Sequence, residues 1–163
     1  MNNLTNEIKS TLLSYYKFFM HALLVGTEIE TNKGIADIIV LCRKSSYIYE
    51  IEIKISVSDL KNELKKDKHK FPYKTKMFDS GPNKYYFCVP TNILEETIQL
   101  ANELNPKYGV LEYKPSLHYK DRINIIKQAS LLHKDVYNYK DRIMQRINND
   151  LCRRYQMLYP VHG

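Results

Sequence analysis

The sequence predicts a single α/β domain over residues 1–163, with a mixed β-sheet flanked by helices. Three observations predict this fold class. Residues 49–55 alternate between apolar and charged side chains, which is typical of a strand with one face in the core. Residues 34–41 are apolar on both faces, which is typical of a strand covered on both sides. Residues 84–113 follow the order strand, helix, strand, which indicates a parallel crossover.

The N-terminal part of the chain predicts a helix followed by an antiparallel meander. Apolar residues recur every three or four positions over residues 4–24, the period of an amphipathic helix, and Gly26 is expected to end that helix. Residues 27–31 alternate as a short strand that turns into the run 34–41. A second short turn leads to residues 49–55, and strands joined by such turns pair antiparallel.

A second helix is expected immediately after this meander. Ser56 is followed by Asp59 in the pattern of a capping box, which predicts a helix start. Val57, Leu60 and Leu64 are then expected to face the core. The polar side of this helix and the segment that follows it carry a run of lysines.

The second half of the chain predicts the crossover, a further strand and a long helix. The crossover consists of a strand over residues 84–90, a helix over 92–104 and a strand over 108–113. A further strand is expected over residues 122–127. Residues 131–158 are expected to form the C-terminal helix, and its inward positions are Val136, Ile143, Ile147 and Leu151.

The composition favours a polyanionic partner and excludes several other classes. The chain carries 25 Lys and Arg against 18 Asp and Glu, a net charge of +7. No segment approaches the ~20 apolar residues of a membrane span, and no secretory signal is evident. The three cysteines form no Cys-x-x-Cys pair, which excludes a zinc knuckle and a disulfide framework. We therefore expect a cytoplasmic protein with free thiols and no membrane partner.

A candidate site follows from one carboxylate in an apolar strand. Asp37 lies in the middle of residues 34–41, where an uncompensated carboxylate is costly. On the next strand, Glu50, Glu52 and Lys54 share one face, about 6–7 Å apart at each step of two. A neighbouring strand lined with Glu and Lys, or a divalent cation between Asp37 and Glu52, would compensate the buried charge. The alternative interpretation of this strand face is that water solvates it.

The pattern Asp37, then Glu52-Ile53-Lys54, resembles the PD-(D/E)xK nuclease superfamily. The resemblance implies a restriction-endonuclease-like core and metal-dependent phosphodiester hydrolysis, with Asp37, Glu52 and Lys54 as catalytic residues. Within that superfamily, residues 25–113 resemble the MmcB-like DNA-repair family in particular. The chain departs from the family pattern in two ways. Ala36 stands where the family usually has proline, and the segment between Asp59 and Tyr85 is longer and richer in lysine than in the family. The motifs that carry the resemblance are Glu52-Ile53-Lys54-x-Ser56-x-x-Asp59, Asp67-Lys68-His69, residues 84–90 and Gly109-Val110-Leu111.

The expected cofactor is Mg²⁺ or Mn²⁺. Carboxylate oxygens of Asp37 and Glu52, with the Ile53 carbonyl, are suitable ligands for such a hard cation. The family pattern favours Glu28 as a third carboxylate, and a pair of surface glutamates, Glu28 with Glu30, is the alternative interpretation. The ion would polarise the scissile phosphate and acidify a bound water.

Lys54 is expected to remain protonated among carboxylates, so it would orient the attacking water or stabilise the pentavalent anion. Glu50 would be either a ligand at the rim or a solvent-facing charge. Ser56 and Asp59 match the family, and helix capping explains both without a catalytic role.

We expect nucleic acid as the partner, with DNA favoured, and a homodimer stays open. A solvated helix face is the alternative interpretation of the lysine run. Tyr73, Tyr85 and Tyr86 are candidates for base stacking or for core packing. A non-catalytic nucleic-acid-binding protein on the same fold is the alternative to a nuclease, and a protein-interaction module is a third. The candidate nucleic-acid-binding residues are Lys65, Lys66, Lys68, His69 and Lys70.

Overall fold

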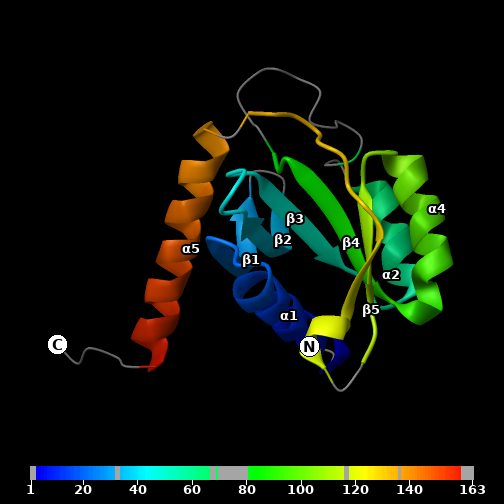
Figure 1. Cartoon of the computed structure of the whole chain (residues 1–163), viewed down its shortest axis with the longest axis horizontal. Coiled ribbons are helices and arrows are strands. Elements are labelled where there is room, and N and C mark those ends of the chain that lie inside the picture. Colours follow the sequence, from blue (N-terminus) through cyan, green and yellow to red (C-terminus); the bar gives the residue numbers. More distant parts are fainter. Residues whose placement is uncertain are drawn as a thin grey trace.

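The computed structural model describes residues 3–31, 34–66, 69, 81–115, 118–135 and 137–158. These residues build a six-stranded sheet flanked by helices (Figure 1). The strands are β1 (Leu24–Thr31), β2 (Gly34–Leu41), β3 (Ile48–Ile53), β4 (Lys84–Pro90), β5 (Gly109–Tyr113) and β6 (Ile123–Lys127). The α-helices are α1 (Asn3–Ser14), α2 (Val57–Asn62), α4 (Leu94–Leu104) and α5 (Tyr137–Leu158). Short helical turns cover Tyr15–Phe19, Glu63–Lys65, Thr91–Ile93 and Tyr119–Asp121.

The sheet is mixed, and its strands lie side by side in chain order. β1, β2 and β3 pair antiparallel, which confirms the meander. β3, β4 and β5 pair parallel, which confirms the crossover through α4. β6 then pairs antiparallel with β5, so the strand expected near residues 122–127 is present as well.

One face of the sheet packs against α1. Ile8 and Leu12 of this helix are fully buried in one apolar cluster with Ile38 of β2 and Ile51 and Ile53 of β3. Tyr49 and Ile55 pack against the same cluster, so the alternation predicted for this strand is confirmed.

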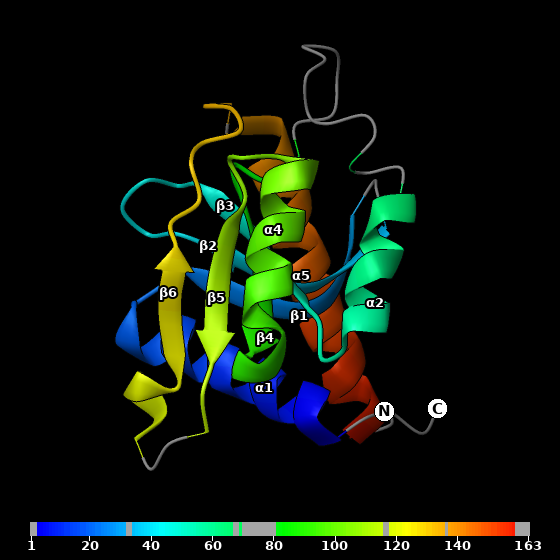
Figure 2. The ribbon, with the colours of Figure 1, turned by 90° about the vertical axis from the view of Figure 1, so that its right-hand side faces the viewer.

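The opposite face carries two apolar clusters under different helices. Tyr139 and Ile143 of α5 pack over the β1–β2 end, against Ile39 and Leu41. The other cluster lies over β4 and β5, whose residues pack with Val57, Ile93 and Ala101. Figure 2 shows α2 and α4 next to each other on this side of the sheet. Glu50 and Glu52 of β3 are buried on this face.

The predicted bounds of two helices are wrong. The first helix ends at Ser14 and passes into a π-helical turn at Tyr15–Phe19. Gly26 does not cap it but lies inside β1, where an added Cβ would lie 3.0 Å from the side chains of Ile147 and Ile29. The close packing of α5 on β1 therefore explains why position 26 is a glycine, which has no Cβ.

The C-terminal helix begins at Tyr137, six residues later than residue 131. Ile143 is buried as predicted, but Leu151 is 65% exposed because the last turns of α5 extend past the sheet (Figure 1). Leu64 is also exposed, since the chain tightens into a 3₁₀ turn at Glu63–Lys65. Val136 lies outside the described residues. No helix in the described parts of the chain is long and apolar enough to cross a bilayer.

Candidate active site

The pairing of β2 with β3 brings Asp37 next to Glu52. Ile38 lies opposite Ile51, the last pair of this antiparallel register, and Asp37 and Glu52 are the next residues of the two strands beyond it. The backbone N–H of Ile53 donates a hydrogen bond to Oδ2 of Asp37, at 2.8 Å. The two acidic residues expected to form a metal site are therefore neighbours across adjacent strands.

The environment of Asp37 disfavours its negative charge. Burial raises the pKa of Asp37 above its ordinary value, and the negative charge of Glu52 raises this pKa further. The hydrogen bond from Ile53 and the positive charges of Lys9 and Lys54 act in the opposite direction without cancelling the rise. A cation between the two carboxylates would remove this repulsion.

The regular alternation of side chains between the two faces of the sheet is interrupted in β1 and β2 beside Asp37. Ile38 packs on the α1 side of the sheet, whereas Ala36, two residues away, packs on the α5 side. In β1, Glu28 has a φ of 55°, and Ile29 belongs to the α5 side as well. A left-handed conformation costs about 1–2 kcal/mol for a non-glycine residue, so the packing on both faces must hold this irregularity in place.

Lys9 joins Glu28 and Asp37 from the N-terminal helix. Its buried ammonium lies 2.7 Å from Oε1 of Glu28 and 3.6 Å from Oδ1 of Asp37. The hydrogen bond and charge of Lys9 hold the pKa of Glu28 below its usual value. Sequence reasoning missed Lys9, although it follows the inward residue Ile8 directly.

Four side chains of alternating charge form a closed ring: Glu52, Lys54, Glu63 and Lys66. Oε1 of Glu52 lies 3.0 Å from Nζ of Lys54 and 2.7 Å from Nζ of Lys66. Oε1 of Glu63 lies 2.9 Å and 2.5 Å from the same two ammonium groups. We call these four residues the charge ring. Glu63 was not predicted, although it lies three residues after Leu60 and so continues the buried side of α2.

The ring extends inward through His69. Its Nε2 lies 2.8 Å from Oε2 of Glu63, and its Nδ1 lies 3.0 Å from the hydroxyl of Tyr108. All three side chains are buried. His69 therefore lies inside the protein next to the candidate site, and not on a lysine-bearing surface as the sequence suggested. Tyr108 had no signal in the sequence beyond its place at the start of the predicted strand 108–113.

Lys54 and Glu63 of the charge ring stay ionised at neutral pH. Burial acts to lower the pKa of Lys54, but the charges of Glu52 and Glu63 outweigh it and raise this pKa above its usual value. Burial likewise acts to raise the pKa of Glu63, but His69, Lys54 and Lys66 hold it well below the usual range. Lys54 is thus a fixed cation beside Glu52.

Several alternatives left open by the sequence are resolved by burial. Glu50 is 3% exposed, so it is neither solvent-facing nor at a rim, and the strand face it shares with Glu52 is not solvated. Tyr85 and Tyr86 are core residues. The hydroxyl of Ser56 accepts a hydrogen bond from the N–H of Asp59, at 3.2 Å, so the helix cap is confirmed.

The candidate nucleic-acid-binding lysines lie in different environments. Lys65 is exposed, and its ammonium lies 3.4 Å from Oδ1 of Asn62. Lys66 turns back into the charge ring. Lys68 and Lys70 lie outside the described residues.

The donor set at Asp37 and Glu52 fits a hard divalent cation. Two mutually repelling carboxylates lie beside the backbone of Ile53, and Mg²⁺ is commonly held by one or two carboxylates and several waters. Within the described ranges, no three His, Cys, Asp or Glu side chains gather as a metal cluster. Glu28 is engaged by Lys9, so a cation here would depend on Asp37 and Glu52.

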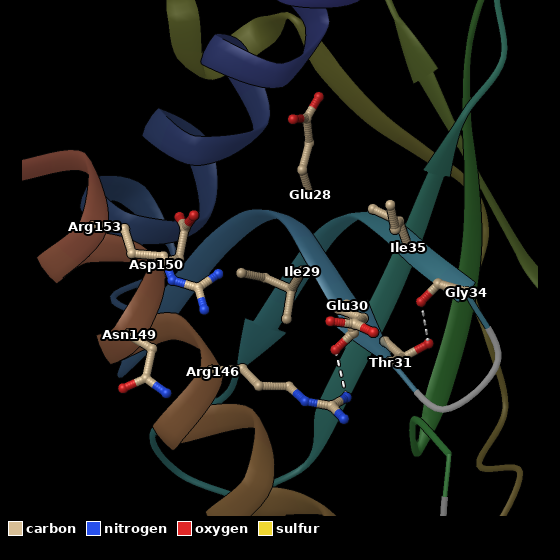
Figure 3. Close-up of a pocket in the computed structure, with 10 residues that line it drawn as sticks. All are labelled: Glu28, Ile29, Glu30, Thr31, Gly34, Ile35, Arg146, Asn149, Asp150 and Arg153. Carbon is tan, nitrogen blue, oxygen red and sulfur yellow. Dashed lines mark hydrogen bonds between the residues drawn. The ribbon is translucent and has the colours of Figure 1, made fainter. Parts of the chain in front are cut away.

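A groove of about 600 Å³ lies between β1 and α5 and includes Glu28 in its lining. Arg146 donates a hydrogen bond from its guanidinium to the carbonyl of Glu30 across the groove (Figure 3). Arg153 lines the same groove from the next turns of α5. The Glu28 carboxylate itself points away from these guanidinium groups, toward Lys9 of α1 (Figure 3). Its lining residues are Glu28, Ile29, Glu30, Thr31, Gly34, Ile35, Arg146, Asn149, Asp150 and Arg153.

Comparison with known proteins identifies a fold but no family. No protein-family model matches the chain, and no curated protein sequence matches it. Among solved structures, the chain is similar to a protein of unknown function from Silicibacter pomeroyi, with a TM-score of 0.65 and 18% sequence identity. The match covers 94% of this chain and 90% of that one, so the two share a fold over nearly their whole lengths.

Proposed function

We propose that this protein is a metal-dependent nuclease that hydrolyses phosphodiester bonds in DNA, on a restriction-endonuclease-like core. The observation that carries the proposal is the 2.8 Å hydrogen bond that holds the Asp37 carboxylate against the backbone of Ile53, next to Glu52, with the Lys54 ammonium 3.0 Å from the Glu52 carboxylate. This is the arrangement that the PD-(D/E)xK resemblance implies. The resemblance to the MmcB-like family adds a role in DNA repair or recombination.

The residues divide the chemistry between them. Asp37 and Glu52 would hold Mg²⁺ or Mn²⁺ with the carbonyl of Ile53, and the bound ion would polarise the phosphate and acidify a water. Ile53 orients the Asp37 carboxylate through its backbone N–H. Lys54 would stabilise the negative charge that develops on the phosphorus oxygens or orient the water. A general-base role does not suit it, because its pKa is raised.

Positive charge around the site supports a nucleic-acid substrate. The chain carries a net charge of +7. Arg146 and Arg153 line the groove that also includes Glu28, and Lys65 is exposed on the turn after α2. Guanidinium and ammonium groups in such places bind phosphates and make the affinity strongly dependent on salt.

One observation favours the alternative, a non-catalytic nucleic-acid-binding protein. Lysines already neutralise the acidic residues of the site: Lys9 lies at Glu28 and Asp37, and Lys66 lies at Glu52. In that alternative the charges stabilise the fold, and DNA binding requires no metal. Binding would then survive chelation and the substitution Asp37→Asn, and would be lost in the double variant Lys61→Glu, Lys65→Glu.

Cleavage assays distinguish the two functions. The purified protein is incubated with single- and double-stranded DNA in Mg²⁺, in Mn²⁺ and in EDTA. Wild type and the control Asp141→Asn, an exposed carboxylate of α5, are expected to cleave only with metal. Asp37→Ala and Lys54→Ala are expected to be slower by at least about 100-fold, with Lys107→Ala, an exposed lysine after α4, as the matched lysine control. Equal cleavage by all variants would reject the assignment of this site.

A further inference from the structure

The members of the charge ring differ in their access to water. The side chains of Glu52, Lys54 and Glu63 are 5%, 7% and 0% exposed, whereas the side chain of Lys66 is 41% exposed. Lys66 is also the last member along the chain, at the point where the backbone leaves the 3₁₀ turn in an extended conformation. Of the two ammonium groups that contact Glu52 within the described residues, that of Lys66 can therefore return to water without first opening the core, whereas that of Lys54 cannot.

We propose that Lys66 is a resident counterion of the metal site, and that a divalent cation displaces it from Glu52. The inference rests on the proposed function, because it concerns the same carboxylate. Oε1 of Glu52 has the Lys66 ammonium at 2.7 Å and the Lys54 ammonium at 3.0 Å. An incoming cation that used this oxygen would meet two positive charges in direct contact with it, and their repulsion opposes binding.

Displacement of Lys66 is the least costly way to admit the cation. Lys54 has Glu63 and Asp59 as further partners, at 2.9 Å and 3.8 Å, and is nearly enclosed. Lys66 regains hydration when it leaves Glu52, and its charge can stay near Glu63 or face solvent. The freed ammonium would then be a positive charge beside a bound phosphodiester.

Lys66 therefore sets the metal affinity in the absence of DNA. Removal of its charge should take one of the two ammonium groups of the charge ring away from Glu52 and strengthen metal binding. The exposed neighbour Lys65 provides a matched control, since it contacts Asn62 and not the ring. Lys66→Arg provides a second control, since it keeps the positive charge.

The test is calorimetric titration of Mn²⁺ into the full chain without nucleic acid. We expect Lys66→Met to bind Mn²⁺ on the order of tenfold more tightly than wild type. Lys65→Met and Lys66→Arg should bind like wild type, and Glu52→Gln should abolish binding in both the wild-type and the Lys66→Met background. Equal or weaker binding by Lys66→Met would overturn the inference, while the proposed function would stand as long as Glu52→Gln still abolished binding. Absence of Mn²⁺ binding in wild type and in Lys66→Met would overturn both.

Thermal unfolding with and without Mn²⁺ covers the case in which Lys66→Met folds poorly. Without metal, this variant should have a lower Tm than wild type, because two buried carboxylates lose a counterion. Mn²⁺ should raise its Tm by more than it raises that of wild type. An equal or smaller rise than in wild type would count against displacement.

Discussion

The backbone N–H of Ile53 donates a hydrogen bond to Oδ2 of Asp37 over 2.8 Å. This bond holds a carboxylate of β2 against the backbone of β3, one residue from Glu52. It keeps the two carboxylates close although they repel each other, so it maintains an arrangement that is unfavourable for the protein alone and favourable for cation binding.

The substitution Asp37→Asn should abolish cleavage and yet raise stability at neutral pH. Asparagine can still accept the Ile53 hydrogen bond, and it removes a charge that burial and Glu52 disfavour. Since the pKa of Asp37 is raised by folding, ionisation of this carboxyl destabilises the folded state above that pKa. The gain should be present at pH 8 without metal and vanish below about pH 4, where the carboxyl is neutral in both states. Urea unfolding of wild type and variant at several pH values measures it, and lower stability of Asp37→Asn at pH 8 would contradict this account.

The substitution Glu63→Gln should destabilise the protein by about 3–5 kcal/mol at pH 7. Glu63 is fully buried, and its loss as a charge leaves Lys54 enclosed with one carboxylate fewer. Because folding lowers the pKa of Glu63, the stabilisation is present above the ordinary carboxyl pKa of about 4.3 and decreases as the pH falls below it.

Denaturant unfolding between pH 8 and pH 3 measures the effect of Glu63→Gln. Glu96→Gln, at an exposed position of α4, is the matched control and should change the stability by less than about 0.5 kcal/mol at every pH. Equal stability of Glu63→Gln and wild type at pH 7 would contradict the role of Glu63 in the charge ring.

Glu28 allows the backbone irregularity to be tested apart from the ion pair. Both Glu28→Gly and Glu28→Ala remove the contact with Lys9, but only glycine relieves the φ of 55°. The glycine variant should therefore be about 1 kcal/mol more stable than the alanine variant. Equilibrium unfolding compares the two directly. An alanine variant as stable as the glycine variant would indicate that Glu28 does not adopt this conformation in solution.

The strands and the two central acidic residues could be predicted because their signals are local. Alternation in residues 49–55 and the apolar run around Asp37 depend only on spacing along the chain. Their antiparallel pairing followed from a short turn, and with it the proximity of Asp37 to Glu52.

The compensating residues could not be predicted because their burial depends on distant elements. A charged residue of a helix is usually solvated. Spacing places Lys9 beside the inward Ile8 and Glu63 three residues after Leu60, but it does not show that either charge is buried against the sheet. The same holds for His69, which is enclosed by Tyr85 and Tyr108 from segments remote in sequence. Both alternatives for Glu50, a ligand at the rim and a solvent-facing charge, failed for the same reason, since α2 and α4 lie on that side of the sheet.

The most direct test of the account is a crystal structure of the protein soaked in Mn²⁺, with anomalous differences recorded for the metal. The account predicts a peak between Asp37 and Glu52, with carboxylate oxygens of both within about 2–2.5 Å of it. It also predicts that the Lys66 ammonium has left Glu52. A fully soaked crystal with no peak between these two carboxylates, or with Mn²⁺ bound only elsewhere, would contradict the central claim that they form a metal site.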